Sequence, residues 1–327
     1  MRLAWFAPAD LAPHTDMATL VRALASRHQI DVIDERAAHD FVWRQRRQPY
    51  DICVYELDNT AAHQFVWPYL IHYPGVTRLH RLTLQDSRAQ SLERDQRLED
   101  FVREFAFCHP GAAAPVLPAL RRIATGSWPM LAIPLLASRV TVVAHAAVAE
   151  SLAADYPSTN VRAIGPGVDR VPANRDEVVW AARWPVHGAP LVDALKGFAA
   201  GRPVVVFDGP ETADWPSVDP HDWRPRSDAP PICVAIDPRD EAHSGRVASR
   251  RLAQDAAVRT ALGTAAEAWW RVNATVEQAA GAFERVLEEA VTRGDPSKPA
   301  GWPSHLSADG LTRARDVLKQ FGLELPF

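Results

Sequence analysis

Cysteine is scarce in this chain. The 327 residues include three, Cys53, Cys108 and Cys233, and none has the CxxC or Cys/His spacing of a zinc site. Three cysteines so far apart indicate buried thiols in a reducing compartment. We therefore expect a cytoplasmic protein without a structural metal.

Long hydrophobic runs are missing as well. The first apolar run ends before Pro8, which is too early for the core of a signal peptide or a membrane span. No later segment reaches the roughly 18 uninterrupted apolar residues that a transmembrane helix needs. The sequence thus predicts no transmembrane segment.

The chain has no excess of positive charge. Its 36 Lys and Arg residues face 40 Asp and Glu residues, which gives a formal net charge of −4. Proteins that bind phosphate backbones usually carry a basic excess. We therefore expect no nucleic-acid partner.

Several catalytic signatures are absent too. The sequence contains no GxxxxGK(S/T) phosphate loop, no HExxH metal motif and no GxSxG nucleophile turn. No GxGxxG follows the first strand candidate, and residues 7–14 after it contain no glycine. That loop lacks the backbone freedom that lets amides approach a phosphate.

The chain does contain short apolar runs that alternate with helical patterns, which is typical of parallel strands covered by crossover helices. Strand candidates lie at residues 2–6, 30–33, 51–55, 76–79, 139–144, 161–164, 177–181, 203–207 and 232–236. Helical patterns lie at residues 15–27, 63–72, 86–107, 146–155, 189–200, 247–290 and 308–321. With 47% hydrophobic residues over this length, the chain exceeds one ordinary core. We predict an α/β protein of two domains.

A GPGVD segment at residues 165–169 divides this pattern, because glycine and proline interrupt regular structure. We predict an N-terminal domain over residues 1–168 and a shorter C-terminal domain over residues 169–290. A linker and a last helix follow over residues 291–327. Residues 208–231 are rich in Pro, Asp and Trp and are expected to form a long loop.

Three stretches, in this order, resemble one family. Residues 50–85 have a strand, an Asn-containing turn, a helix, Pro-Gly, a strand and Leu-His; residues 140–169 have a strand ending before a His, a helix and the GPGVD loop. The third, ALKGFAAGRPVVVFD at residues 194–208, is followed by helices up to residue 290. They are similar to the retaining GT-B glycosyltransferases of family 4. The resemblance implies two Rossmann-like domains whose parallel sheets face a cleft, with the nucleotide sugar against the C-terminal domain and the acceptor against the N-terminal one.

The resemblance also implies where the acceptor side lies. His80 matches the family histidine near the sugar and is the catalytic candidate; a neutral imidazole accepts a hydrogen bond from a sugar hydroxyl, and a charged one helps to balance a diphosphate. The alternative is a histidine that caps a strand end. Asn59, His63 and His145 follow other strands and are acceptor-side candidates, with a structural role as the alternative for His145.

Two departures from the family pattern concern charge. Arg81 replaces the expected acid after His80, which favours an anionic ligand there, or else is a solvated arginine. In the C-terminal half, the segment whose Arg and Lys neutralise the leaving diphosphate is missing, and Gly188 and Lys196 stand where the family has two glutamates.

We therefore predict a truncated donor domain. Its remaining donor-side candidates are glycines of the GPGVD loop and residues around the following turns: Gly165, Gly167, Arg183, His187, Gly188, Lys196 and Arg202. For Lys196 and Arg202, the alternative is an exposed charge on a helix and its turn.

The function that this resemblance implies is transfer of a hexose from a UDP- or GDP-linked sugar to an acceptor. No tightly bound cofactor is expected, and a requirement for divalent metal stays open. The alternatives are a non-catalytic binding or scaffolding descendant that has lost the donor motifs, and a nucleotide- or sugar-phosphate-binding protein of unrelated chemistry. A truncated domain exposes sheet edges, so a homo-oligomer or pairing with another glycosyltransferase is a further expectation.

Overall fold

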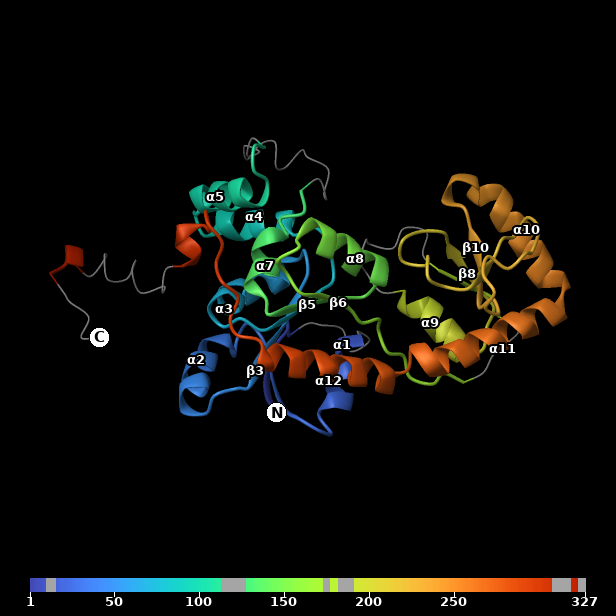
Figure 1. The fold of residues 1–327 in the computed structure, drawn as a ribbon, viewed down its shortest axis with the longest axis horizontal. Helices are drawn as coiled ribbons and strands as arrows, with labels where there is room; N and C mark the ends of the chain where they lie inside the picture. Colours follow the sequence, from blue (N-terminus) through green and yellow to red (C-terminus); the bar gives the residue numbers. More distant parts are fainter. Residues whose placement is uncertain (10–15, 113–127, 173–176, 182–190, 308–318, 323–327) are drawn as a thin grey trace.

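Two parallel β-sheets with helices on their faces form the molecule (Figure 1). The computed structural model describes residues 1–9, 16–112, 128–172, 177–181, 191–307 and 319–322. The first sheet has the order β2-β1-β3-β4-β5-β6 and the second the order β7-β8-β10-β9. Every strand pairing in both is parallel. The prediction of an α/β fold with parallel sheets is confirmed.

The first sheet is built from the apolar runs of the first half of the chain. Its strands are β1 (Arg2–Phe6), β2 (Gln29–Ile33), β3 (Ile52–Leu57), β4 (Val76–Leu79), β5 (Val140–Val143) and β6 (Val161–Ala163). The crossover segments contain α1 (Asp16–Leu24), α2 (Ala38–Arg47), the 3₁₀ turn η1 (Ala61–His63), α3 (Val66–His72), α4 (Gln85–Arg94), α5 (Leu98–Cys108), α7 (Ala132–Ala137) and α8 (Ala146–Asp155).

The two faces of this sheet have separate cores. On one face, α2, α3, α7 and α8 bury side chains such as Phe41, Leu70 and Leu135 against alternate strand residues. On the other face, α1 and α12 (Val276–Thr292) pack Leu20 and Phe283 against the remaining strand residues. Burial on both faces explains why the inner strands β1, β3, β4 and β5 are mostly apolar, whereas the edge strands β2 and β6 are partly exposed.

The second sheet is smaller. Its strands are β7 (Val179–Trp180), β8 (Val204–Phe207), β9 (Ser217–Val218) and β10 (Cys233–Ile236), and its helices are α9 (Val192–Ala199), η2 (Pro238–Asp240), α10 (Glu241–Gln254) and α11 (Ala256–Asn273). Val204 and Val206 point into one core and Val205 into another, so β8 is also covered on both faces. Strand β9 lies within the segment that we expected to be a loop.

Helix α12 joins the two halves of the chain. The sequence pattern placed it in the C-terminal domain, yet its Phe283 and Leu287 belong to the core of the first sheet, and Phe283 lies 5.3 Å from the ring of Trp5. Figure 1 shows α12 extending from α11 across the first sheet. The apolar stripe of this helix is the same whichever sheet it covers, so periodicity alone does not assign it.

Two helices expected to be continuous are interrupted. Residues 86–107 form α4 and α5, with Gln96 at a φ of 56° between them. Residues 247–290 form α10, α11 and α12, because the side chains of Asp255 and Thr275 accept hydrogen bonds from the amides of Val258 and Gln278 and so begin new helices. Both residues are common N-cap types, and such a cap begins a new helix even where the apolar periodicity continues through it.

The three cysteines have free thiols, and burial raises the pKa of each to about 12. The expectation of buried thiols is confirmed for Cys53 and Cys233, while Cys108 is partly exposed. No helix among the described residues has the length and apolar content needed to cross a membrane.

Candidate active site

The strand order of the first sheet indicates where a ligand of this fold class binds. The order changes direction at β1, since β2 lies on one side of it and β3 on the other. The helices that follow β1 and β3, α1 and α3, accordingly cover opposite faces. The connections that follow β1 and β3 therefore leave the sheet toward opposite faces. Ligands of open α/β sheets bind beyond the carboxyl ends of two such strands.

A buried carboxylate lies at this point. Glu56, the penultimate residue of β3, has no exposed surface. Its oxygens accept hydrogen bonds from Trp5 Nε1 at 2.8 Å, from Arg78 Nη1 at 2.8 Å and from His80 Nε2 at 2.5 Å. Because side chains alternate along a strand, Val54 and Glu56 share a face of the sheet, as do Val76 and Arg78.

Glu56 is ionised despite its burial. Burial raises the pKa of this carboxyl. The charge of Arg78 and the hydrogen bond and charge of His80 lower it by more than burial raises it, so that the pKa is about 2. Arg78 also bonds Asp16 at the start of α1, with 2.6 Å between Nη2 and Oδ2. The two acids hold the pKa of Arg78 above its ordinary value in spite of burial.

His80 is oriented by this carboxylate. Burial lowers the pKa of His80, but the hydrogen bond and the charge of Glu56 raise it above the ordinary value. The side chain is 24% exposed, and the backbone amide donates to Leu57 O at the strand end. Since Nε2 faces Glu56, Nδ1 is the nitrogen left to meet a ligand, and it has no hydrogen-bond partner among the described residues.

His63 is a second imidazole near this carboxylate. It lies on η1, is 5% exposed, and its Nδ1 is 2.8 Å from Thr60 Oγ1. Its Nε2 is buried and has no hydrogen-bond partner among the described residues. Burial lowers the pKa of His63 to about 4, while the charges of Asp58 and Glu56 act in the opposite direction. His63 is therefore neutral at pH 7 and retains one unused polar atom.

The other acceptor-side candidates have identifiable partners. Asn59 accepts from the amide of Ser87 and donates to Asp86, so it fixes the start of α4. Arg81 pairs with Asp58 at 2.9 Å, which balances the positive charge that favoured an anionic ligand. His145 lies at the residue before α8 and is half-buried.

The donor-side candidates are dispersed. A Cβ added to Gly167 would lie 2.6 Å from Val276 Cα, so this glycine permits close packing against the start of α12, whereas a Cβ on Gly165 would meet only Ala144 O at 3.6 Å. Lys196 Nζ lies 3.8 Å from Asp193, and Arg202 Nη1 lies 3.1 Å from Glu177. Arg183, His187 and Gly188 lie outside the described residues.

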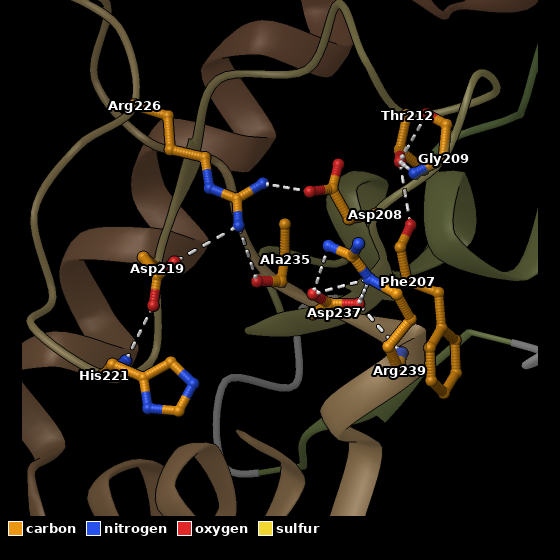
Figure 2. A network of polar contacts seen from close by, with 10 residues as sticks. All are labelled: Phe207, Asp208, Gly209, Thr212, Asp219, His221, Arg226, Ala235, Asp237 and Arg239. Atoms are coloured by element: carbon orange, nitrogen blue, oxygen red, sulfur yellow. Dashed lines mark hydrogen bonds and ion pairs between the residues drawn. The ribbon is translucent and has the colours of Figure 1, made fainter. Parts of the chain in front are cut away.

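A polar network that we did not predict follows the strands of the second sheet. Asp208, Asp219 and Asp237 come directly after β8, β9 and β10. Figure 2 shows Arg226 between two of them, with Nη1 2.7 Å from Asp208 and Nη2 3.4 Å from Asp219, and Arg239 beside Asp237 at 2.8 Å. The signal was present for two of the three, because the apolar runs PVVVF and ICVAI are each followed directly by an aspartate.

Such carboxylates accept hydrogen bonds from ribose or sugar hydroxyls, and their excess over the two arginines does not favour a diphosphate. Among the residues that the structure describes, no group of His, Cys, Asp or Glu side chains has the arrangement of a metal site.

Comparison with known proteins gives distant matches only. No protein-family model matches the chain, and no curated protein matches it. Among solved structures it is similar to the glycotransferase of kitacinnamycin, with 13% identity, a TM-score of 0.43 and coverage of 88% of this chain and 98% of that one. It is also similar to the spinosyn forosaminyltransferase SpnP (12% identity, TM-score 0.38, coverage 88% and 99%) and to the glycosyltransferase VinC in complex with dTDP (13%, 0.36, 88% and 100%). At this level of similarity, function has to be inferred from the side chains of this chain.

Proposed function

We propose that this protein is a glycosyltransferase in which His80 is the general base. The observation that carries the proposal is the pairing of His80 with an ionised, fully buried Glu56 at the point where the strand order of the first sheet changes direction. A buried charged pair is costly unless it is satisfied, and this one is satisfied by three donors. Perturbed titratable groups in a ligand crevice are candidates for acid-base chemistry.

The arrangement supports a defined proton transfer. The acceptor hydroxyl gives its proton to Nδ1 of His80 as its oxygen bonds to the sugar carbon, and the nucleoside diphosphate leaves with the electrons of the broken bond. The imidazolium formed keeps its Nε2 proton, and this N–H group remains hydrogen-bonded to the carboxylate of Glu56. Trp5 and Arg78 hold Glu56 in place. A positioned base of this kind contributes about 10²- to 10⁴-fold to a rate.

The ribose or sugar hydroxyls of the nucleotide sugar are proposed to bind beyond the carboxyl ends of β8, β9 and β10, with the diphosphate outside this group of carboxylates. Asp208, Asp219 and Asp237 supply acceptors for these hydroxyls there. A UDP- or GDP-linked hexose as donor and the family 4 relationship stay predictions. Direct displacement with His80 as base would invert the sugar carbon, so the proposed step departs from the retaining outcome that the resemblance implied. A divalent metal, if used, would arrive with the diphosphate.

One observation favours the alternative of a non-catalytic binding protein. The described cations among the predicted donor-side residues, Lys196 and Arg202, already face Asp193 and Glu177, and Gly167 is occupied by packing against α12. Loss of a nucleoside diphosphate needs help with its developing negative charge. A descendant that no longer performs transfer would not need such help.

Calorimetry separates the two. We expect UDP, GDP or dTDP to bind with a Kd below about a millimolar. The reason is that a glycosyltransferase also binds the nucleoside diphosphate that leaves its donor. Asp208→Asn should weaken that binding, and Asp222→Asn, an exposed acid that does not directly follow a strand, is its control. Absence of binding to all three, with and without Mg²⁺, would support the non-catalytic alternative.

A further inference from the structure

A cavity of about 920 Å³ lies beside η1, and none of the side chains assigned to the site above lines it. Its walls come from η1, α3, α4, the start of α5 and the 3₁₀ turn η3 (Ser304–Leu306), which returns from the far end of the chain. Ala61, Ala62 and Gln64 line it, whereas His63 on the same turn does not. The turn η1 thus separates this cavity from the Glu56–His80 pair.

The cavity has an apolar body and three buried polar side chains in its lining, Gln64, Ser91 and Arg88, of which Arg88 is the charged one. Phe65, Pro68, Ile71, Leu92 and Leu306 form its apolar lining. Its volume is in the range of pockets that bury most of a drug-sized molecule, about 300 to 1,000 Å³. Arg88 is 6% exposed and stacks over Trp67, with 4.6 Å between the guanidinium and the ring.

Two nitrogens of the Arg88 guanidinium are bonded to Glu104, and the third, Nη1, is available to a ligand. Its Nε and Nη2 donate to Glu104 at 2.7 and 2.5 Å, and Glu104, which has no exposed surface, also bonds His305 Nε2 at 2.8 Å. Burial raises the pKa of Glu104, but Arg88 and His305 bring it below its ordinary value. No partner of Nη1 is found among the described residues, and Arg88 lines the cavity.

Charge balance decides which ligand fits. The other two guanidiniums in the lining are also paired, Arg94 with Asp95 at 3.1 Å and Arg97 with Asp100 at 2.7 Å. Each described arginine of the cavity therefore faces a carboxylate, so an added anion would lack a counter-charge and would lose its hydration. A neutral oxygen gains a hydrogen bond from Nη1 without that cost.

We propose that this cavity binds an uncharged, largely apolar molecule of drug size that carries a hydroxyl or carbonyl oxygen, which accepts a hydrogen bond from Arg88 Nη1. The proposal does not depend on the glycosyltransferase function. It rests on the cavity, the buried Arg88–Glu104–His305 network and the pairing of the lining arginines.

The test uses a steroid diol and its anionic derivative, since they share one apolar body. We expect 17β-estradiol to bind the intact chain with one site and a Kd of about 10 μM or less, and estradiol 3-sulfate to bind at least about tenfold more weakly. Ala62→Trp adds a large ring at an exposed residue of the cavity lining and should weaken estradiol binding at least about tenfold. Ala242→Trp, at an exposed helical alanine outside the cavity, should not change it.

Arg88→Lys keeps the positive charge but removes the guanidinium group, and should also lower the affinity for estradiol. The melting temperature of this variant shows whether it still folds. If it does not fold, the Ala62→Trp variant alone tests the proposal. The proposal is overturned if neither probe binds, if the sulfate binds as tightly as the diol, or if Ala62→Trp and Ala242→Trp bind equally well.

Discussion

The Nε2 atom of His80 lies 2.5 Å from Oε2 of Glu56, a carboxylate with no exposed surface. Two further donors, Trp5 and Arg78, occupy the other oxygen, so the carboxylate cannot turn away from the imidazole. The ring is thereby fixed with Nδ1 as the nitrogen available to a substrate. Orientation of a base by a buried acid is a recurring feature of acid-base catalysis.

Glu56→Gln should shift the pH dependence of transfer. The negative charge of Glu56 raises the pKa of His80, and a general base must be unprotonated, so the rate of the native protein should rise with pH through a midpoint above 6.5. Without that charge the midpoint should move to lower pH, and the maximal rate should fall. Glu150→Gln, at an exposed acid on α8, is the control and should leave the midpoint in place.

The same substitution should reduce stability. It leaves Arg78 with Asp16 alone, and breaking a buried pair costs roughly 3–5 kcal/mol. Urea unfolding at pH 7 measures the loss. An unchanged free energy of unfolding in Glu56→Gln would show that the buried network does not support the fold.

His63 should make stability depend on pH between 6.5 and about 4. Its pKa is lowered in the folded state, so the unfolded chain binds its proton first as the pH falls. The contribution is present above pH 6.5 and is lost as the pH falls to about 4, with a total of roughly 3 kcal/mol. His63→Gln should flatten this part of the profile, whereas the exposed His39→Gln should retain it. Parallel profiles for His63→Gln and the native chain would contradict this assignment.

Gly167→Ala should destabilise the protein without weakening nucleotide binding. The added Cβ would lie 2.6 Å from the backbone of Val276, and overpacking of this kind costs roughly 1–3 kcal/mol. Gly281→Ala, on α12 itself, meets nothing within 4 Å and should stabilise by roughly 0.5–1 kcal/mol through helix propensity. A loss of nucleotide affinity in Gly167→Ala at unchanged stability would instead place this glycine in the donor site.

Lys196→Ala with Arg202→Ala should change nucleotide affinity less than about twofold at low salt, because both side chains face carboxylates of their own domain. Calorimetry at two ionic strengths checks this. A large loss that is greatest at low salt would return these two residues to the donor site, since screening weakens contacts between charges.

Much of the fold follows from local patterns, and much of the site does not. The strands of both sheets except β9 were recognisable because each is a short apolar run, and His80 stood out as a polar residue directly after one of them. Glu56 and Arg78 were missed because they lie inside apolar runs, in ICVYEL and VTRL. A charged residue near the carboxyl end of a buried strand was the available signal, and period-2 alternation would have placed the two on one face.

The donor side was harder for a physical reason. Gly167 and the cations of the second half were weighed by sequence position, whereas their roles depend on which element packs beside them, and α12 reaches Gly167 from more than a hundred residues away. The arrangement of Arg88, Glu104 and His305 is likewise set by tertiary contact. Long-range juxtapositions of this kind leave no local trace in a sequence.

The most direct test of the central claim is release of nucleoside diphosphate from UDP-glucose, UDP-N-acetylglucosamine and GDP-mannose, with water or an added alcohol as acceptor. We predict that the native chain releases the nucleotide from one donor, and that His80→Gln binds the same donor with equal affinity but releases it at least about 10²-fold more slowly. Equal rates for the two proteins, or no release from any donor by the native chain, would contradict a general-base role for His80.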